Sequence, residues 1–174
     1  MDNKELANLI FPNLEYDVEY YENKYPDRNL PEGAYVTRFA PSPTGFVHIG
    51  GLFGGIIDRK LARQTNGTFI LRIEDTDQKR EIENGTLQIV NGLKDFGINP
   101  DEGMVGESEA IGNYGPYKQS ERAHLYNTVI KHLISVGRAY PCFCEKCEDK
   151  EEIVAKREQE IDENNGTIDH DRCR

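Results

Sequence analysis

The chain has 174 residues, and its 21 Lys and Arg residues against 31 Asp and Glu residues give a formal net charge of −10. This balance excludes a generic basic nucleic-acid coat protein, but not a protein that binds RNA through a local basic face, because net charge describes long-range steering rather than sites. The length suits one domain, or one domain and part of another.

The sequence carries no signal for a membrane or for secretion. Its longest weakly polar stretch, residues 47–57, contains His48 and four glycines, whereas a membrane span needs about 18 or more apolar residues. The first five residues lack the basic and then apolar order of a secretory signal. We therefore expect a cytoplasmic protein that does not bind membranes, in which the four cysteines are reduced thiols or metal ligands.

The first 32 residues are polar and rich in tyrosine. One short helix is expected near residues 6–11. Two interpretations of the whole segment stay open: an extension packed on the surface of the domain, or a partly ordered tail.

Strands and helices are expected to alternate after Gly33. β-Branched and aromatic residues predict a strand over residues 34–40 and a second strand over residues 68–73. Between them, apolar residues at helical spacing predict a helix that begins near Leu52 and ends before Gly67. A strand, a helix and a strand joined by short connections are typical of a parallel sheet.

Two further amphipathic helices are expected, over residues 82–96 and between Ser120 and Gly137. A short strand is expected over residues 139–144. Residues 145–163 are so polar that any helix there would bury little surface.

Both predicted strands end in polar clusters, over residues 41–51 and 74–77. Ligands of open α/β sheets bind beyond the carboxyl ends of the strands. His48 stands just before a predicted helix, where free backbone N–H groups favour a phosphate, and Gly50 and Gly51 leave room for a nucleotide near the backbone. Taken alone, a histidine in a glycine-rich loop more often makes a local hydrogen bond.

Four ordered blocks of sequence carry a resemblance to a known family. They are RFAPSPTG (38–45) followed by HIGG (48–51), then RIEDTD (72–77), GPYKQSER (115–122) and GRAYPCFC (137–144). Together they resemble the glutamyl-tRNA synthetases, which are class I aminoacyl-tRNA synthetases, over about residues 35–174. Glutaminyl enzymes are less similar, because their loop typically reads PEPNG where this chain has PSPTG.

The resemblance implies an α/β fold. The chain would hold the first half of a class I synthetase Rossmann-type domain with a parallel sheet, and the start of the inserted acceptor-binding (connective) subdomain. It would divide into an N-terminal extension (1–32), the first half of the catalytic domain (33–138) and the start of the inserted subdomain (139–174).

The implied reaction is the ligation of L-glutamate to tRNA(Glu). Glutamate attacks the α-phosphate of ATP, which arrives with Mg²⁺, to give glutamyl-adenylate and pyrophosphate, and the terminal adenosine of the tRNA then takes the glutamyl group. The family needs tRNA for the activation step, and we expect the complete protein to be a monomer. Such chemistry asks the protein mainly for positioning and for donors aimed at the developing phosphate charge.

The resemblance also implies roles for single residues. His48 matches the first histidine of the class I His-x-Gly-His motif and would donate to the phosphate in the transition state, whereas Gly51 stands in place of the second histidine. Arg38 would bind the side-chain carboxylate of glutamate, which its planar guanidinium matches, and Glu74 would hold the α-ammonium group. Without the motifs, Arg38 and Glu74 form only a strand-end ion pair. The implied glutamate-binding residues are Arg38, Ala40, Ser42 and Glu74, and the implied ATP-binding residues are Thr44, Gly45, His48, Gly50 and Gly51.

The cysteines match a structural zinc site that some members of the family have. Three thiolates, those of Cys142, Cys144 and Cys173, match its ligands. The fourth ligand would be Cys147, His170 or a residue beyond the end of this chain. An incomplete site or buried reduced thiols are the alternatives.

The sequence lacks a lysine loop of the KMSKS type, which class I synthetases need, and an anticodon-binding domain. We therefore expect an N-terminal fragment of a larger enzyme that is inactive alone. Two other functions stay open. A short paralogue of the family transfers glutamate to a modified nucleoside, queuosine, in the anticodon of tRNA(Asp), and a non-catalytic synthetase-like module would bind tRNA or protein.

Few residues of the chain suit contacts with the phosphates of tRNA. They are Arg59, Lys60 and Arg63 on one predicted helix, and Lys79 and Arg80 after the second strand. A solvated helix face is an equally good interpretation of these residues.

Overall fold

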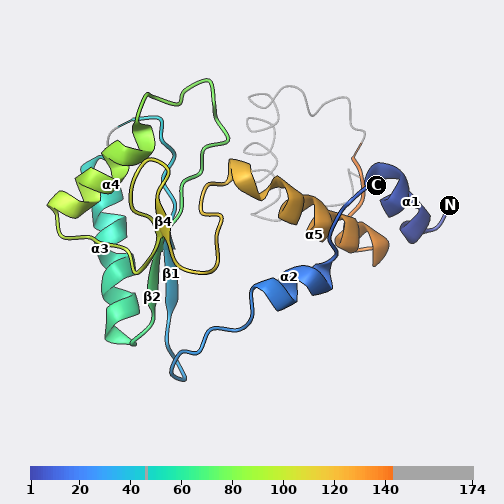
Figure 1. Cartoon of the computed structure of the whole chain (residues 1–174), viewed down its shortest axis with the longest axis horizontal. Coiled ribbons are helices and arrows are strands. Elements are labelled where there is room, and N and C mark those ends of the chain that lie inside the picture. The colour runs from blue at the N-terminus through green and yellow to red at the C-terminus, as the bar shows by residue number, and fades with distance from the viewer. Residues whose placement is uncertain (46, 143–174) are drawn as a thin grey trace, which may run out of the picture.

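The computed structural model describes residues 1–45 and 47–142 of the chain. Its sheet has four strands, which lie side by side in chain order (Figure 1). The strands are β1 (Val36–Phe39), β2 (Thr68–Leu71), β3 (Glu102–Met104) and β4 (Ala110–Ile111). β1 pairs in parallel with β2, and β2 with β3, whereas β4 is antiparallel to β3. The predicted α/β class with a mainly parallel sheet is therefore confirmed.

Two helices lie together on one side of the sheet, α3 (Ile49–Gln64) and α4 (Gly85–Asp95) (Figure 1). Their buried side chains, Leu52 from α3 and Ile89 and Leu93 from α4, join a core with Phe69 and Leu71 of β2. This burial holds the carboxyl ends of β1 and β2 in place, because apolar surface removed from water stabilises the packed arrangement.

α3 buries fewer of its apolar residues than the sequence pattern suggests. Its buried residues are Leu52, Gly55 and Ala62, whereas Phe53 is 64% exposed. Helical spacing thus predicted the helix, but not which side chains face the sheet, because spacing fixes a stripe and not its partner.

A second group of helices lies beside the sheet (Figure 1). α5 (Ala123–Ser135) follows the 3₁₀ helix η1 (Ser120–Arg122), and α1 (Asn3–Ile10) and α2 (Val18–Lys24) pack against it. The Asp2 carboxylate and Glu5 form a capping box at the start of α1, which satisfies backbone N–H groups that lack partners in the helix.

The structure thus decides between the two interpretations of the first 32 residues. The segment is ordered and packed, with two helices where the sequence predicted one. Polar contacts to α5 secure it: the Thr128 hydroxyl donates to the Tyr16 carbonyl (3.1 Å), and the Lys131 ammonium donates to the Phe11 carbonyl (2.8 Å).

The expected strand over residues 139–144 is wrong for its described part, because residues 139–142 have no regular structure. Residues 143–144 and the polar segment 145–163 lie outside the described residues. Across residues 1–45 and 47–142, no helix combines the length and the apolarity that a membrane span needs.

Candidate functional site

The two predicted polar clusters meet at one edge of the sheet. The backbone N–H of Arg72 donates to the Phe39 carbonyl (3.0 Å), and that of Glu74 donates to the Pro41 carbonyl (3.0 Å). These bonds continue the parallel pairing of β1 with β2 past the ends of both strands. The loop after β1 and the segment after β2 therefore lie side by side, as their positions in a parallel sheet predict.

Arg38 and Glu74 face one another at this edge. The guanidinium Nη1 of Arg38 lies 3.4 Å from the Glu74 carboxylate Oε1, and their side chains are 48% and 37% exposed. An ion pair this open to water contributes only about 0–1 kcal/mol to stability. Both side chains can therefore leave one another for a charged ligand at little cost.

His48 caps the amino end of α3. Its Nδ1 accepts hydrogen bonds from the backbone N–H groups of Gly50 (3.1 Å) and Gly51 (3.4 Å). Because Nδ1 accepts, the proton of the neutral imidazole is on Nε2, which can donate to a ligand. The sequence predicts that free backbone N–H groups at this helix end favour a phosphate, whereas here the imidazole of His48 occupies those of Gly50 and Gly51.

The absence of a side chain at Gly50 makes room for this cap. A Cβ atom at that position would lie 3.0 Å from His48 Cε1, which is closer than ordinary van der Waals contact. The cap formed by His48 therefore favours glycine at position 50 for a steric reason.

A pocket of about 480 Å³ opens beside His48. This volume lies within the range of about 300–1,000 Å³ that is usual for small-molecule sites. Its lining comes from the end of β1, the following loop, the start of α3 and one residue of α4: Phe39, Pro41, Ser42, Thr44, Gly45, Val47, His48, Gly51 and Ile89.

The pocket brings together most of the residues predicted to bind ATP, and one predicted to bind glutamate. Thr44, Gly45, His48 and Gly51 line it, together with Ser42. Gly50 sits one residue away on α3. The other predicted glutamate-binding residues, Arg38, Ala40 and Glu74, lie at the neighbouring strand ends and do not line it.

The segment after β2 is held from its other side by Lys118 and Ser120, for which the sequence predicts no role. Ile73 makes an isolated parallel bridge with Lys118. The Asp75 carboxylate, which is buried, accepts from the backbone N–H of Ser120 (2.8 Å) and from its hydroxyl (2.6 Å). Block 115–122 stands out in the sequence, but Ser120 lies 45 residues after Asp75. No local sequence pattern therefore predicts their contact.

Asp77 takes part in a local contact instead. Its carboxylate pairs with Arg80 at 2.5 Å. The hydrogen bond from Arg80 lowers the pKa of Asp77 below its usual value. Both aspartates after β2 are thus engaged within the protein.

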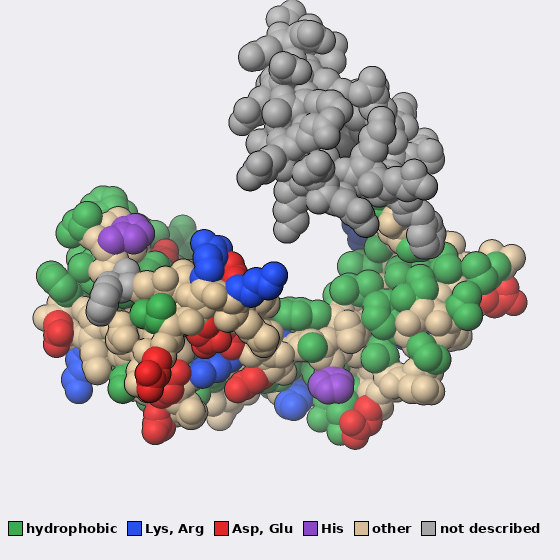
Figure 2. Space-filling model, turned by 90° about the horizontal axis from the view of Figure 1, so that it is seen from above, with side chains coloured by type: hydrophobic (Ala, Val, Ile, Leu, Met, Phe, Trp, Pro, Cys, Tyr) green, Lys and Arg blue, Asp and Glu red, His purple; other side chains and the backbone are tan. Residues whose placement is uncertain are grey.

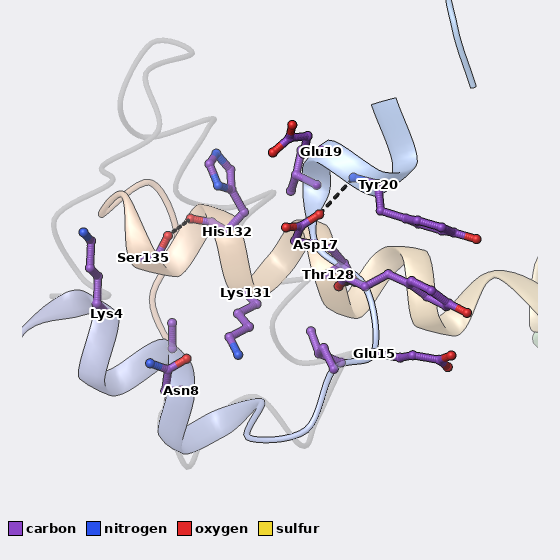
Figure 3. Close-up of a pocket in the computed structure, with 14 residues that line it drawn as sticks. Lys4, Asn8, Glu15, Asp17, Glu19, Tyr20, Thr128, Lys131, His132 and Ser135 are labelled. Carbon is purple, nitrogen blue, oxygen red and sulfur yellow. Dashed lines mark hydrogen bonds between the residues drawn. The ribbon is translucent and has the colours of Figure 1, made fainter. Parts of the chain in front are cut away.

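A larger pocket of about 710 Å³ lies in the helical part of the molecule, between α1, α2 and α5 (Figure 3). Lysines and carboxylates both line it, and Figure 3 shows Asp17 directed at the backbone of Tyr20, whose N–H it accepts at 2.9 Å. Thr128 and Lys131 on its wall already bond to backbone carbonyls of the extension. None of the predicted site residues lines this pocket.

Basic and acidic side chains lie near one another on part of the surface. On the face shown in Figure 2, Lys and Arg side chains of the part that contains the sheet stand next to Asp and Glu side chains. Arg59, Lys60 and Arg63 line a pocket of about 500 Å³ with the exposed ring of Phe96. A role for these residues in binding tRNA stays a prediction.

The zinc prediction falls almost entirely outside the described residues. Of the predicted ligands only Cys142 is described, and it is exposed; Cys144, Cys147, His170 and Cys173 are not described. Within residues 1–45 and 47–142, no three His, Cys, Asp or Glu side chains are grouped as a metal site would need.

Comparison with known protein families places the chain. The model of the family described as tRNA synthetases class I (E and Q), catalytic domain, matches residues 34–173. The chain belongs to this family. Its mainly parallel sheet is accordingly that of a class I synthetase catalytic domain.

Individual class I synthetases are similar to the chain at high identity. It is 53% identical over 168 residues to a glutamate–tRNA ligase of Acetivibrio thermocellus, covering 96% of this chain and 30% of that protein. It is 52% identical over 161 residues to that of Clostridium beijerinckii, covering 92% of this chain and 28% of that protein. The chain thus spans less than a third of the length of these curated relatives.

Solved synthetase structures agree with the fold. A crystal structure of a glutamate tRNA ligase from Elizabethkingia meningosepticum, in complex with its amino acid, superposes with a TM-score of 0.57 at 35% identity. The match covers 79% of this chain and 25% of that chain. At 35% identity the two chains are similar in sequence as well as in fold. This likeness therefore supports the family assignment as well as the architecture.

Proposed function

We propose that the chain is part of a glutamate–tRNA ligase, an enzyme that joins L-glutamate to tRNA(Glu) through glutamyl-adenylate. The observation that carries the proposal is the arrangement at the strand ends. A cation and an anion, Arg38 and Glu74, face one another at the edge of the sheet, and a nucleotide-sized pocket with an imidazole donor opens beside them. The high identity to glutamate–tRNA ligases supports this reading over a non-catalytic module.

In this proposal the Arg38–Glu74 pair opens when glutamate binds. The guanidinium of Arg38 takes the side-chain carboxylate of the substrate, which a neutral glutamine amide cannot replace with equal strength. The carboxylate of Glu74 takes the α-ammonium group. Arg38 thus exchanges the carboxylate of Glu74 for that of the substrate, and Glu74 exchanges the guanidinium for the α-ammonium group. Neither side chain is left buried and unpaired. Ala40 and Ser42 would border the same subsite.

ATP would occupy the pocket beside His48. The backbone of Thr44, Gly45 and Gly51 would lie along the nucleotide, with Gly50 behind the imidazole. His48 Nε2 would donate to the phosphate as its charge develops, because a fixed donor stabilises that charge more than mobile water does. Mg²⁺ would arrive with ATP, held largely by phosphate oxygens and water.

The remaining parts of the proposal concern the organisation of the protein. We assign residues 33–138 to the first half of the catalytic domain, residues 1–32 to an extension and residues 139–174 to the start of an inserted subdomain. A structural zinc site on Cys142, Cys144 and Cys173 belongs to that subdomain, and the amount of zinc per chain in the purified complete protein tests it. The protein would act in the cytoplasm as a monomer.

Charging of purified tRNAs by the complete protein tests the function directly. We expect radioactive glutamate to be attached to tRNA(Glu), glutamine not to be attached, and the 174-residue chain alone to attach neither. Glutamate attached to tRNA(Asp) instead would assign the protein to the queuosine-modifying paralogues. Failure to charge any tRNA would favour a non-catalytic module.

A further inference from the structure

A short segment of the N-terminal extension is fastened to the loop that precedes η1. We call residues 25–28 the strap. The hydroxyl of Tyr25 donates to the Gly115 carbonyl (2.5 Å), and the hydroxyl of Tyr114 donates back to the Pro26 carbonyl (2.8 Å). The two tyrosine rings are stacked, with centroids 6.2 Å apart. The strap and the loop over residues 112–117 therefore hold one another by bonds in both directions.

Arg28 joins the strap to the sheet as well. Its guanidinium donates to both carboxylate oxygens of Glu102 on β3, at 2.5 and 2.7 Å. The Glu102 side chain is only 7% exposed. The same guanidinium lies 3.7 Å from the centre of the Tyr114 ring, within the range of a cation–π contact. One side chain thus fixes the loop against the third strand.

The ion pair between Arg28 and Glu102 is bidentate and largely buried. A bidentate guanidinium–carboxylate pair has a fixed geometry that a lysine cannot reproduce. The hydrogen bonds that Arg28 donates to Glu102 raise the pKa of Arg28 above its usual value. Glu102 is buried, so removal of its partner would leave an uncompensated charge.

The end of the loop and the residues that follow it, up to Ser120 of η1, bind the segment that carries Glu74. Tyr117 is buried, and its carbonyl accepts from the Ile73 N–H (2.9 Å), while the Gln119 N–H donates to the Ile73 carbonyl (2.8 Å). Ser120 donates twice to the Asp75 carboxylate. Both neighbours of Glu74, Ile73 and Asp75, are thus held by residues 117–120.

The loop is itself fixed at Tyr117. The phenol oxygen of Tyr117 accepts from the Tyr114 N–H (2.9 Å), so the ring ties the strap-facing part of the loop to the part that grips Ile73. Burial raises the pKa of Tyr117 to about 12. A continuous set of bonds therefore runs from Arg28 and Tyr25 through Tyr114 and Tyr117 to the backbone around Glu74.

We infer that the strap positions Glu74, and that Arg28 and Tyr25 are positioning residues for the binding of the amino acid. The inference rests on the proposed function, in which Glu74 holds the α-ammonium group of glutamate. Neither strap residue lines the pocket beside His48, so both act through the loop. The strap also lies outside residues 34–173, which the family model matches.

Small displacements at Glu74 are enough for a measurable effect. Misplacement of a binding group by about 1 Å can cost up to about a hundredfold in rate. The Glu74 segment bonds to Pro41, but within the described residues the strap itself makes no hydrogen bond to residues 42–45 or to His48, which belong to the proposed ATP site. Loosening the strap should therefore weaken glutamate binding and leave ATP binding unchanged.

The test uses the complete protein with two mild strap variants. Arg28→Lys keeps the positive charge but cannot form the bidentate contact with Glu102. Tyr25→Phe removes the hydroxyl that donates to Gly115. Matched controls are Arg138→Lys and Tyr35→Phe, at exposed positions outside the strap. We expect the KM for glutamate to rise about five- to fiftyfold in the strap variants, with the KM for ATP within about twofold of wild type and the controls unchanged.

Hydrogen exchange tests whether the strap stabilises the segment around Glu74, and it does not require enzyme activity. Peptides that contain Ile73 or residues 117–120 should exchange faster in both strap variants than in the controls, while peptides from α3 keep their rates. Global destabilisation would instead raise exchange in α3 as well, and raise the KM values of both substrates together; either result would overturn the inference.

The two proposals fail in different ways. If the wild-type protein shows no glutamate-dependent activity, the proposed function is wrong, and the exchange experiment alone decides whether the strap holds the Glu74 segment. If the wild type is active but the strap variants match the controls in glutamate KM, the positioning role is wrong and the proposed function stands.

Discussion

The two nitrogens of the His48 imidazole have different tasks at the residue scale. Nδ1 accepts from the first N–H groups of α3, and this orients the ring and leaves the proton on Nε2. The family motif predicts that His48 donates to the phosphate, and the sequence also predicts free N–H groups at the helix end that favour a phosphate. The structure adds a physical reason for the spacing, since the residue that would bind phosphate also starts the helix.

Replacement of His48 separates these tasks. Asn is a good helix cap, so His48→Asn should keep the stability within about 0.5 kcal/mol of wild type. It removes the Nε2 donor, and we expect kcat for charging to fall about 10²- to 10³-fold. His48→Ala should lose the cap too, at about 1 kcal/mol. Equal kcat values for wild type and His48→Asn would show that His48 only caps α3.

Arg38 gives a second prediction at the residue scale. Arg38→Gln should weaken glutamate binding by about 1.5–3 kcal/mol, the range of a hydrogen bond to a charged group, or about 10- to 150-fold in KM. Stability should change by less than about 1 kcal/mol, because the pair with Glu74 is exposed. Arg38→Lys keeps the charge but not the planar guanidinium, so its KM for glutamate should lie between those of wild type and Arg38→Gln. A large loss of stability with an unchanged KM would make the pair structural.

At the scale of elements, periodicity and turn residues predicted β1, β2, α3, α4 and α5. β3 and β4 were missed because they are very short, and β3 contains a glycine at its centre and an acidic residue at its start. α2 was missed because its sequence buries no side chain fully, so no apolar stripe marks it.

Gly103 in β3 yields a prediction for this element. Its φ is +119°, and an added Cβ would overlap the backbone of Leu71 on β2. Gly103→Ala should therefore lower the free energy of unfolding by about 2 kcal/mol or more. Urea unfolding of the 174-residue chain, followed by circular dichroism, measures this.

Gly97→Ala is the matched control for Gly103→Ala. Gly97 also has a positive φ, of +68°, but nothing lies within 4 Å of an added Cβ. It should cost only the strain of the left-handed backbone, about 1–2 kcal/mol. If the two variants lose equal stability, the close approach of β3 to β2 at Gly103 is not what requires glycine there.

Whole-molecule organisation shows where sequence reasoning stops. Arg38, His48 and Glu74 could be named in advance because the sequence blocks around them resemble a known family, and because a parallel sheet brings the polar clusters after its strands together. The strap could not be named, because Arg28 and Glu102 are 74 residues apart and no local pattern marks their pairing. Likewise, the sequence alone left open whether the extension was packed.

In the proposed function, the strand ends of this chain bind glutamate and ATP for adenylate formation. Glutamate-dependent exchange of radioactive pyrophosphate into ATP by the complete protein, with and without tRNA(Glu), tests it most directly. We predict exchange only when glutamate and tRNA(Glu) are both present. Exchange without tRNA would point to the queuosine-modifying paralogue, and no exchange under either condition would contradict the claim.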